Sequence, residues 1–142
     1  MPLSELYQED GRAHLTLTPG DLVVAVTLPA EVPRSAYAKV RLRGAVDFPL
    51  AGVAVALRVV AGKLAALRVA LTGTNSRPFL LADTEPLLGH PLDGAALQRL
   101  HTLVQKQVQP MRTTIASANY RRVAAATQAR RLTASLFAEC TA

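Results

Sequence analysis

The sequence is poor in aromatic residues and in thiols. Tryptophan is absent, phenylalanine and tyrosine occur three times each, and Cys140 is the one cysteine. A single thiol can form neither an internal disulfide nor a multi-thiolate metal site, which suits a reducing cytoplasm. Half of the 142 residues are nevertheless apolar. We therefore expect a single domain over residues 1–142, with a core built mainly of alanine, leucine and valine.

Long hydrophobic runs are also missing. The longest apolar windows are interrupted by Arg58, Lys63 and Arg68, whereas a membrane-spanning helix needs about 20 apolar residues. The N-terminus has no basic region followed by an apolar stretch, so no signal peptide is predicted. These features predict a cytoplasmic protein that contacts no membrane.

Convergent catalytic groups are absent as well. His14, His90 and His101 are far apart and lack ligand spacing. No glycine-rich phosphate loop, no serine with elbow-type glycine flanks and no paired carboxylates occur. His101 is expected to make a local hydrogen bond, and Cys140 to be a quiet thiol. We predict no catalytic residue and no metal site, so the chain is expected to catalyse nothing alone.

The net charge of +6 admits nucleic acid, a membrane surface or an acidic protein as partner. The cations are nearly all arginines, spread along the chain without a run of like charges. With few aromatic residues to stack bases, Arg121-Arg122 and Arg130-Arg131 are interpreted as a solvated or intersubunit face. We expect no nucleic-acid partner on this basis.

Alternating apolar residues in the first half predict an antiparallel sheet. Strands are predicted at 22–28, 36–43, 52–60 and 63–72. Ala61-Gly62 lies between the last two and is a plausible hairpin turn. The strand at 36–43 has one apolar face and one polar, cationic face.

The second half has helical signals. A short helical turn is predicted at 83–88. Asp93 is the candidate N-cap of a helix that ends near Pro110, and Ser117 of a helix that runs to about Glu139. Strands followed by helices indicate an α+β fold, with three to four strands covered on one side by two to three helices.

One segment is chemically distinctive. Alternation places Lys39, Arg41 and Arg43 on one side of a strand, within about 7 Å of their nearest neighbours. Because like charges repel, an anionic group should lie opposite them. Asp47 on the following loop can neutralise one, and a phosphate, a flavin or a partner carboxylate could meet the others. From the residues alone, a solvated face with an Arg–Asp pair that contributes little stability is favoured.

An ordered set of short motifs covers nearly the whole chain. The motifs are Pro19-Gly20-Asp21-Leu22-Val23, Leu28-Pro29, Tyr37-x-Lys39-x-x-x-Arg43-x-x-x-Asp47-Phe48-Pro49, Gly52-Val53-Ala54-Val55, the loop 73–78, Thr84-Glu85-x-Leu87-Leu88-x-His90 and Ser117-x-x-Tyr120-Arg121-Arg122. Together they resemble the C-terminal domain of the flavin subunits of molybdenum hydroxylases, the xanthine dehydrogenase and carbon monoxide dehydrogenase family. His90 departs from the pattern, since it stands one residue beyond the usual glycine, Gly89. Leu6-Tyr7-x-x-Asp10-Gly11 is similar to the 4-hydroxybenzoyl-CoA reductase branch.

The resemblance implies an antiparallel sheet with a helical bundle that closes one side of an FAD pocket. A preceding domain would bind most of the FAD, and electrons would pass between a molybdopterin subunit, an iron–sulfur subunit and the flavin. By position, Lys39 matches a lysine near the isoalloxazine. Arg43 and Asp47 match a charged loop where an electron donor or acceptor approaches. The resemblance therefore implies FAD in the intact subunit and no cofactor for the isolated chain.

Two interpretations of the chain remain open. In the first, the chain is a fragment of a longer subunit, as Met1 directly before a domain-like start suggests, and its partners are the FAD domain and the two other subunits. In the second, it is a stand-alone basic module that binds nucleic acid or an acidic protein. Loss of partner surfaces would expose apolar area, which leaves self-association of a fragment open.

Overall fold

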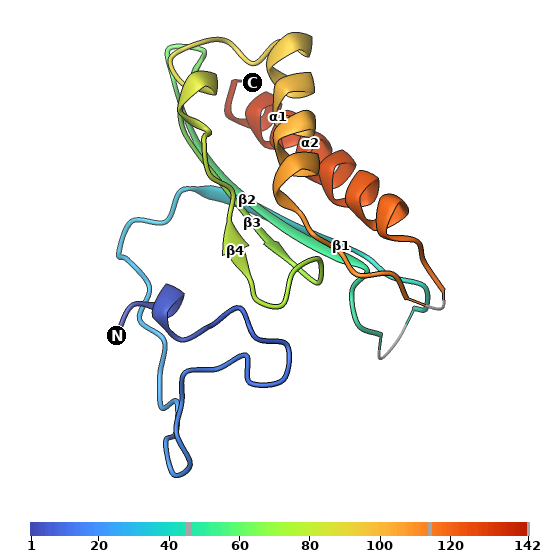
Figure 1. Ribbon diagram of the computed structural model, residues 1–142. Coiled ribbons are helices and arrows are strands. Elements are labelled where there is room, and N and C mark those ends of the chain that lie inside the picture. The colour runs from blue at the N-terminus through green and yellow to red at the C-terminus, as the bar shows by residue number, and fades with distance from the viewer. Residues whose placement is uncertain (45–46, 114, 142) are drawn as a thin grey trace.

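The computed structural model describes residues 1–44, 47–113 and 115–141. One antiparallel sheet, in the order β1-β2-β3-β4, carries helices α1 and α2 on one face (Figure 1). The strands are β1 (Arg34–Val40), β2 (Ala51–Val60), β3 (Lys63–Thr72) and β4 (Phe79–Leu80), and the helices are α1 (Gly94–Gln107) and α2 (Ala118–Thr141), with 3-10 turns at Leu3–Glu5 and Glu85–Leu87. The predicted α+β class and the one-sided helix layer are confirmed.

The hairpin β2–β3 is the centre of the sheet. Ala61 and Gly62 have φ values of 49° and 71°, which is the left-handed pair of a tight type I′ turn. The turn pairs Val60 with Lys63, and an irregularity between Arg58 and Val59 then shifts the register by one residue, so that Leu57 pairs with Leu67. The shifted register places the alternating apolar residues of both strands on the same side, where they are buried: Val53, Val55, Leu57, Leu67, Val69 and Leu71.

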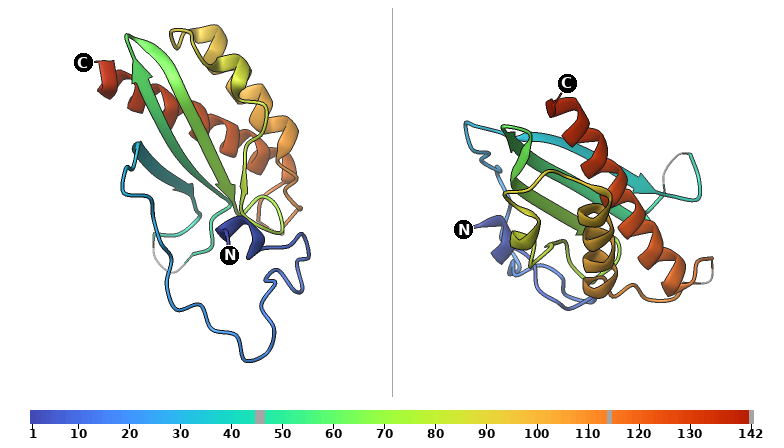
Figure 2. Two further views of the ribbon diagram at one scale, coloured as in Figure 1. Left: turned by 90° about the vertical axis from the view of Figure 1, so that its left-hand side faces the viewer. Right: turned by 90° about the horizontal axis from the view of Figure 1, so that it is seen from above.

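The two helices begin where the sequence predicts. The Asp93 carboxylate accepts a hydrogen bond from the Ala96 N–H at 2.7 Å, and the Ser117 hydroxyl accepts one from the Tyr120 N–H at 3.1 Å. Each side chain satisfies a backbone donor of the first helical turn. Fully buried alanines on α2 (Ala125, Ala126 and Ala129) let that helix lie close to the sheet and to α1 (Figure 2).

Two strand predictions need correction. Residues 22–28 form no strand, and no backbone pairing of these residues with another described part of the chain is found. The predicted strand 36–43 ends at Val40. Beyond that point, the Asp47 carboxylate accepts hydrogen bonds from the Leu42 and Arg43 N–H groups, which turns the chain away from β2.

Residues 1–33, called the arm below, lie apart from the helix layer (Figure 1). The arm is bonded to the loop that follows β3. The Glu9 carboxylate accepts hydrogen bonds from the Ser76 N–H at 3.2 Å and from the Arg77 guanidinium at 2.9 Å. The Arg77 contact lowers the pKa of Glu9. Within the described residues, no helix combines the length and apolar character that a membrane crossing requires.

Candidate functional site

The candidate site lies on the face of the sheet opposite the helices, here called the outer face. Lys39, Gly52 and Thr72 pair in register across β1, β2 and β3, so they share this face. The Lys39 side chain is exposed, and the Tyr37 side chain, two residues earlier on the same face, is 57% exposed. An ammonium group and an aromatic ring thus project side by side from the edge strand.

Gly52 makes this arrangement possible. A Cβ at residue 52 would lie 2.7 Å from Thr72 Cγ2 and 3.0 Å from Tyr37 Oη. Both distances are too short for an ordinary side chain, so only glycine allows Tyr37 and Thr72 to approach each other over β2. The sequence carries Gly52 inside an alternating apolar run, where its role as a spacer cannot be recognised without the register.

The predicted row of three cations on one strand face does not form. Lys39 is on β1, whereas Arg41 and Arg43 follow the end of the strand. Asp47 does neutralise one cation, as predicted: its Oδ1 lies 3.7 Å from Arg43 Nη2. Among the residues that the structure describes, neither Lys39 nor Arg41 takes part in a salt bridge.

Asp47 organises the loop after β1. Its Oδ2 accepts hydrogen bonds from the Arg43 N–H at 2.8 Å and the Leu42 N–H at 3.0 Å. These donors, the Arg43 N–H first, hold the pKa of Asp47 below its ordinary value of 3.8. The carboxylate is 13% exposed while the Arg43 side chain is 74% exposed. Asp47 is therefore a fixed anion inside the loop, and Arg43 an exposed cation at its rim.

Arg121 holds together the loops beside the site, a role that sequence reasoning missed. Its guanidinium donates hydrogen bonds to the carbonyls of Leu50 (3.0 Å), Met111 (2.7 Å) and Gly73. The interpretation of Arg121 as part of a solvated or intersubunit face is therefore wrong. Arg130 and Arg131, farther along α2, are exposed.

The loop after β3 packs under the loop before β2. Gly73 has a φ of 75°, and a Cβ there would lie 2.8 Å from the Pro49 carbonyl oxygen. The Asn75 side-chain oxygen accepts a hydrogen bond from the Gln109 N–H at 3.2 Å. We call Tyr37, Lys39, Gly52 and Thr72 the outer-face cluster; the loops that follow β1 and β3 at its end of the sheet are bonded to each other through Arg121.

The histidines and the cysteine give no second site. His101 Nδ1 is buried without a hydrogen-bond partner among the described residues, so the predicted local hydrogen bond does not occur at this nitrogen. Burial lowers the pKa of His101, and the charge of Arg130 lowers it further. Cys140 is a half-buried free thiol. No group of metal-ligating side chains is found within residues 1–44, 47–113 and 115–141.

Comparisons with known proteins agree with the fold. Residues 35–136 match the family model of the CO dehydrogenase flavoprotein C-terminal domain. The cyanide-inactivated Cu,Mo-CO dehydrogenase is similar at 25% identity with a TM-score of 0.82, over 95% of this chain and 48% of that chain. The reconstituted CO dehydrogenase from Oligotropha carboxidovorans is similar at 27% identity and a TM-score of 0.80, over the same shares of the two chains.

A third solved structure, quinoline 2-oxidoreductase from Pseudomonas putida 86, shares the fold at 18% identity and a TM-score of 0.74. That match covers 81% of this chain and 40% of the other. The chain thus spans less than half the length of the solved chains it matches.

Proposed function

Because the chain belongs to the family of CO dehydrogenase flavoprotein C-terminal domains, we propose that it covers one side of the FAD in a molybdenum hydroxylase-type oxidoreductase. The observation that carries this proposal is the outer-face cluster. Tyr37 and Lys39 project from β1 beside Gly52, on the face that the helices leave free. The cluster supplies an aromatic ring and a cation without a salt-bridge partner among the described residues.

These groups fit the ring system of a flavin. An aromatic side chain offers a stacking surface, and an ammonium group near the pyrimidine edge stabilises a negative charge that develops there. The bound FAD would store the electrons that pass between donor and acceptor. The role of Lys39 in this proposal is to favour the anionic reduced form, which raises the reduction potential.

Arg43 and Asp47 have a different role in the proposal. Asp47 fixes the loop after β1 through the Leu42 and Arg43 N–H groups. The exposed Arg43 guanidinium then borders the approach to the flavin, where it attracts an anionic or acidic electron-transfer partner. Asp47 acts here as a positioning residue.

The rest of the FAD site is proposed to lie elsewhere in the subunit. The sequence has no glycine-rich phosphate-binding loop, and the matched CO dehydrogenase chains are about twice as long as this one. We therefore expect weak or no FAD binding by this chain alone. Its proposed partners are the FAD-binding domain of the same subunit, a molybdopterin subunit and an iron–sulfur subunit.

Two finer assignments belong to the same proposal. The motif at Leu6, Tyr7, Asp10 and Gly11 favours the 4-hydroxybenzoyl-CoA reductase branch, and the single cysteine favours a cytoplasmic enzyme. The competing reading as a free-standing basic module has less support. One of the cations that it counts is already bonded within the chain, since Arg121 donates hydrogen bonds to three carbonyls.

The proposal is tested by Lys39→Ala in the intact subunit. Loss of the ammonium should lower the flavin midpoint potential by about 20–40 mV, the equivalent of about 1–2 kcal/mol for a two-electron couple. Lys63→Ala is the matched control, because Lys63 is an exposed lysine at the other end of the sheet. An unchanged potential and unchanged turnover in Lys39→Ala would reject the role of Lys39.

A further inference from the structure

The helix layer carries charges of one sign. No aspartate or glutamate occurs between Asp93 and Glu139, a stretch that includes α1 and most of α2. The same stretch contains seven cations: Arg99, Lys106, Arg112, Arg121, Arg122, Arg130 and Arg131. Surface helices usually mix both signs, because a carboxylate three or four residues from a cation stabilises the helix. The helix layer therefore lacks the acidic residues that would normally pair with its arginines and lysines.

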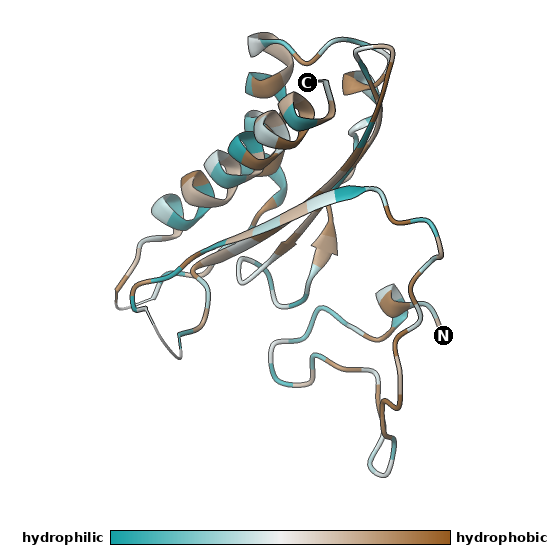
Figure 3. Ribbon diagram, turned by 180° about the vertical axis from the view of Figure 1, so that it is seen from behind, coloured by the Kyte–Doolittle hydropathy of each residue, from teal (hydrophilic) through white to brown (hydrophobic). Residues whose placement is uncertain are grey.

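Four of these cations lie on the helices and are exposed to solvent: Arg99 and Lys106 on α1, Arg130 and Arg131 on α2. Figure 3 shows strongly hydrophilic stretches along α2. Within the part of the chain that the structure describes, none of the four takes part in a salt bridge. Their positive charge is therefore available to another molecule.

The helix dipoles do not account for this excess of cations. The N-terminus of a helix favours carboxylates and its C-terminus favours cations. Neither helix has an acidic residue in its first turn, and α2 has no basic residue in its last turn. Of the four exposed cations, Lys106 in the last turn of α1 is the one that a helix dipole favours. Charges that do not stabilise their own helix are expected to serve binding.

A groove on α1 lies between two of these cations. It has a volume of about 430 Å³ and is lined by Ala95, Gln98, Arg99, Thr102, Leu103 and Lys106. Arg99 and Lys106 are seven residues apart, which places them on one face of the helix, about 10 Å apart along its axis. Small and apolar side chains lie between them. The groove thus combines a contact surface with two cations at a fixed spacing.

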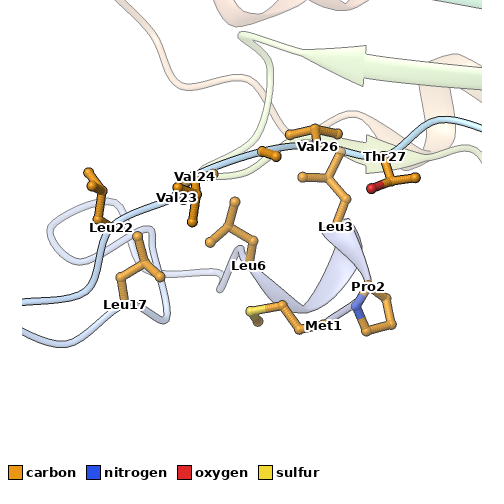
Figure 4. Close-up of a pocket in the computed structure, with 11 residues that line it drawn as sticks. Met1, Pro2, Leu3, Leu6, Leu17, Leu22, Val23, Val24, Val26 and Thr27 are labelled. Atoms are coloured by element: carbon orange, nitrogen blue, oxygen red, sulfur yellow. The ribbon is translucent and has the colours of Figure 1, made fainter.

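The larger hollow in the arm has a different character. Leu3, Leu6, Leu17 and Val24 are among the residues that line it, and its described lining includes no charged side chain (Figure 4). That hollow therefore offers apolar contact alone. The groove on α1 can in addition select its occupant by charge, because an anionic group would meet Arg99 and Lys106.

We propose that the groove on α1 binds an acidic segment of another protein chain, whose two carboxylates, about 10 Å apart, pair with Arg99 and Lys106. Carboxylates seven residues apart on a helix, or three apart on an extended segment, have this spacing. Arg130 lies near His101 of α1, so the cationic surface continues from the groove onto α2. The proposal rests on the proposed function only for the identity of this chain, which is one of the two partner subunits.

The residues of the helix layer favour a protein over nucleic acid or lipid. Proteins that bind single strands stack the bases on aromatic rings, and α1 has no aromatic residue. A helix that lies on a membrane inserts an apolar face, whereas the buried residues of α1, Leu100 and Val104, already belong to the core. Arginine is enriched in protein–protein interfaces, and three of the four exposed cations are arginines.

The location of the groove allows both proposed roles at once. The helices cover one face of the sheet, and the outer-face cluster lies on the other (Figure 2). A partner that docks on α1 would therefore leave the proposed flavin-covering surface accessible.

Charge reversal tests the proposal in the assembled enzyme. Arg99→Glu/Lys106→Glu in the complete flavin subunit should weaken its association with the partner subunits at least about 10-fold. Arg34→Glu/Lys63→Glu is the matched control, because it also reverses one exposed arginine and one exposed lysine, on β1 and β3 outside the helix layer. It should leave the dissociation constant, measured by sedimentation velocity, within about twofold of wild type. An unchanged constant for Arg99→Glu/Lys106→Glu would overturn the proposal.

Salt dependence provides an independent readout. An increase from 0.15 M to 1 M salt shortens the range of charge interactions from about 8 Å to about 3 Å. It should therefore weaken the association of the wild-type subunit and have little effect on that of Arg99→Glu/Lys106→Glu. The thermal midpoint of the chain alone should be the same for both, which excludes misfolding as the cause. Equal salt dependence of the two proteins would contradict the proposal.

Other polyanions are distinguished with defined probes. Double-stranded DNA and phosphatidylserine vesicles would be titrated separately into the chain, and we expect no binding at 0.15 M salt that the two substitutions abolish. Binding of either probe that Arg99→Glu/Lys106→Glu abolishes, together with unaffected subunit association, would overturn the proposal in favour of that polyanion.

Flavin absorbance recorded on the same samples separates the two proposals. Association that charge reversal weakens in a colourless subunit would support the acidic partner and reject the FAD assignment. A yellow subunit whose association does not respond to charge reversal would do the reverse.

Discussion

Tyr37 and Thr72, on the two strands that flank β2, meet over Gly52, and a Cβ on Gly52 would lie 3.0 Å from the Tyr37 hydroxyl oxygen. The glycine is thus a spacer for side chains of its neighbours. The outer-face surface that we propose to cover the flavin depends on this close approach, so the addition of one methyl group at residue 52 should have a measurable effect on stability.

Gly52→Ala should destabilise the protein by about 1–3 kcal/mol, because the added methyl would lie 2.7 Å from Thr72 Cγ2. Denaturant unfolding measures the effect. Gly94→Ala is the matched control, since a Cβ there meets nothing within 4 Å, and it should be neutral within about 0.5 kcal/mol. The double variant Gly52→Ala/Thr72→Ser, which removes Cγ2, should recover part of the loss. No recovery would show that the clash is not the cause.

Arg121→Met should cost about 2–3 kcal/mol, because three carbonyls lose a charged donor. Arg122→Met is the comparison, since Arg122 is the neighbouring half-buried arginine on α2 and no hydrogen bond from its side chain is found within the described residues. It should cost much less. Similar free energies of unfolding for the two variants would contradict the role that we assign to Arg121, which is to hold the loops beside the site together.

Asp47 should titrate at low pH. Its hydrogen bonds from Arg43 and Leu42 lower its folded pKa below 3.8, so the stability that it contributes is present above the ordinary pKa. That stability is lost as the pH falls through the folded value. NMR shifts of the Leu42 and Arg43 amides should report a midpoint below 3.8. A midpoint at or above that value would mean that the loop is not closed in solution.

His101 provides a test on the helix layer. Burial is the first cause of its lowered pKa, and the charge of Arg130 is the second. Arg130→Gln should therefore raise the pKa of His101 while leaving it below 6.5. Because the folded pKa is lowered, stability should decrease as the pH falls from 6.5 toward that folded value. An NMR titration of His101 in both proteins measures the shift, and an unchanged midpoint would mean that Arg130 lies farther from His101 than the structure places it.

The elements that the sequence predicts well are those specified by local signals. The pair Ala61-Gly62 favours one turn, and Asp93 and Ser117 each satisfy a donor of the next helical turn. Such signals act over a few residues and need no knowledge of the rest of the chain. The hairpin and both helices could therefore be predicted.

The errors involve partners that are distant in the sequence or absent. The alternation at 22–28 predicts a strand that does not form, because alternation does not supply the partner strand that pairing needs. Arg121 pairs with carbonyls 10 to 71 residues away, which no local pattern reveals. Of the predicted site residues, Arg43 and Asp47 do contact each other. The function of Lys39 remains a prediction, because it depends on a group that the chain does not contain.

The visible spectrum tests the central claim most directly. The chain alone, and the same chain expressed together with the flavin-binding half of its subunit, would be purified and their absorbance recorded. We predict a colourless chain and a yellow longer protein, since this domain covers a flavin that it does not hold by itself. A longer protein without flavin would contradict the account, and so would a chain that is yellow alone.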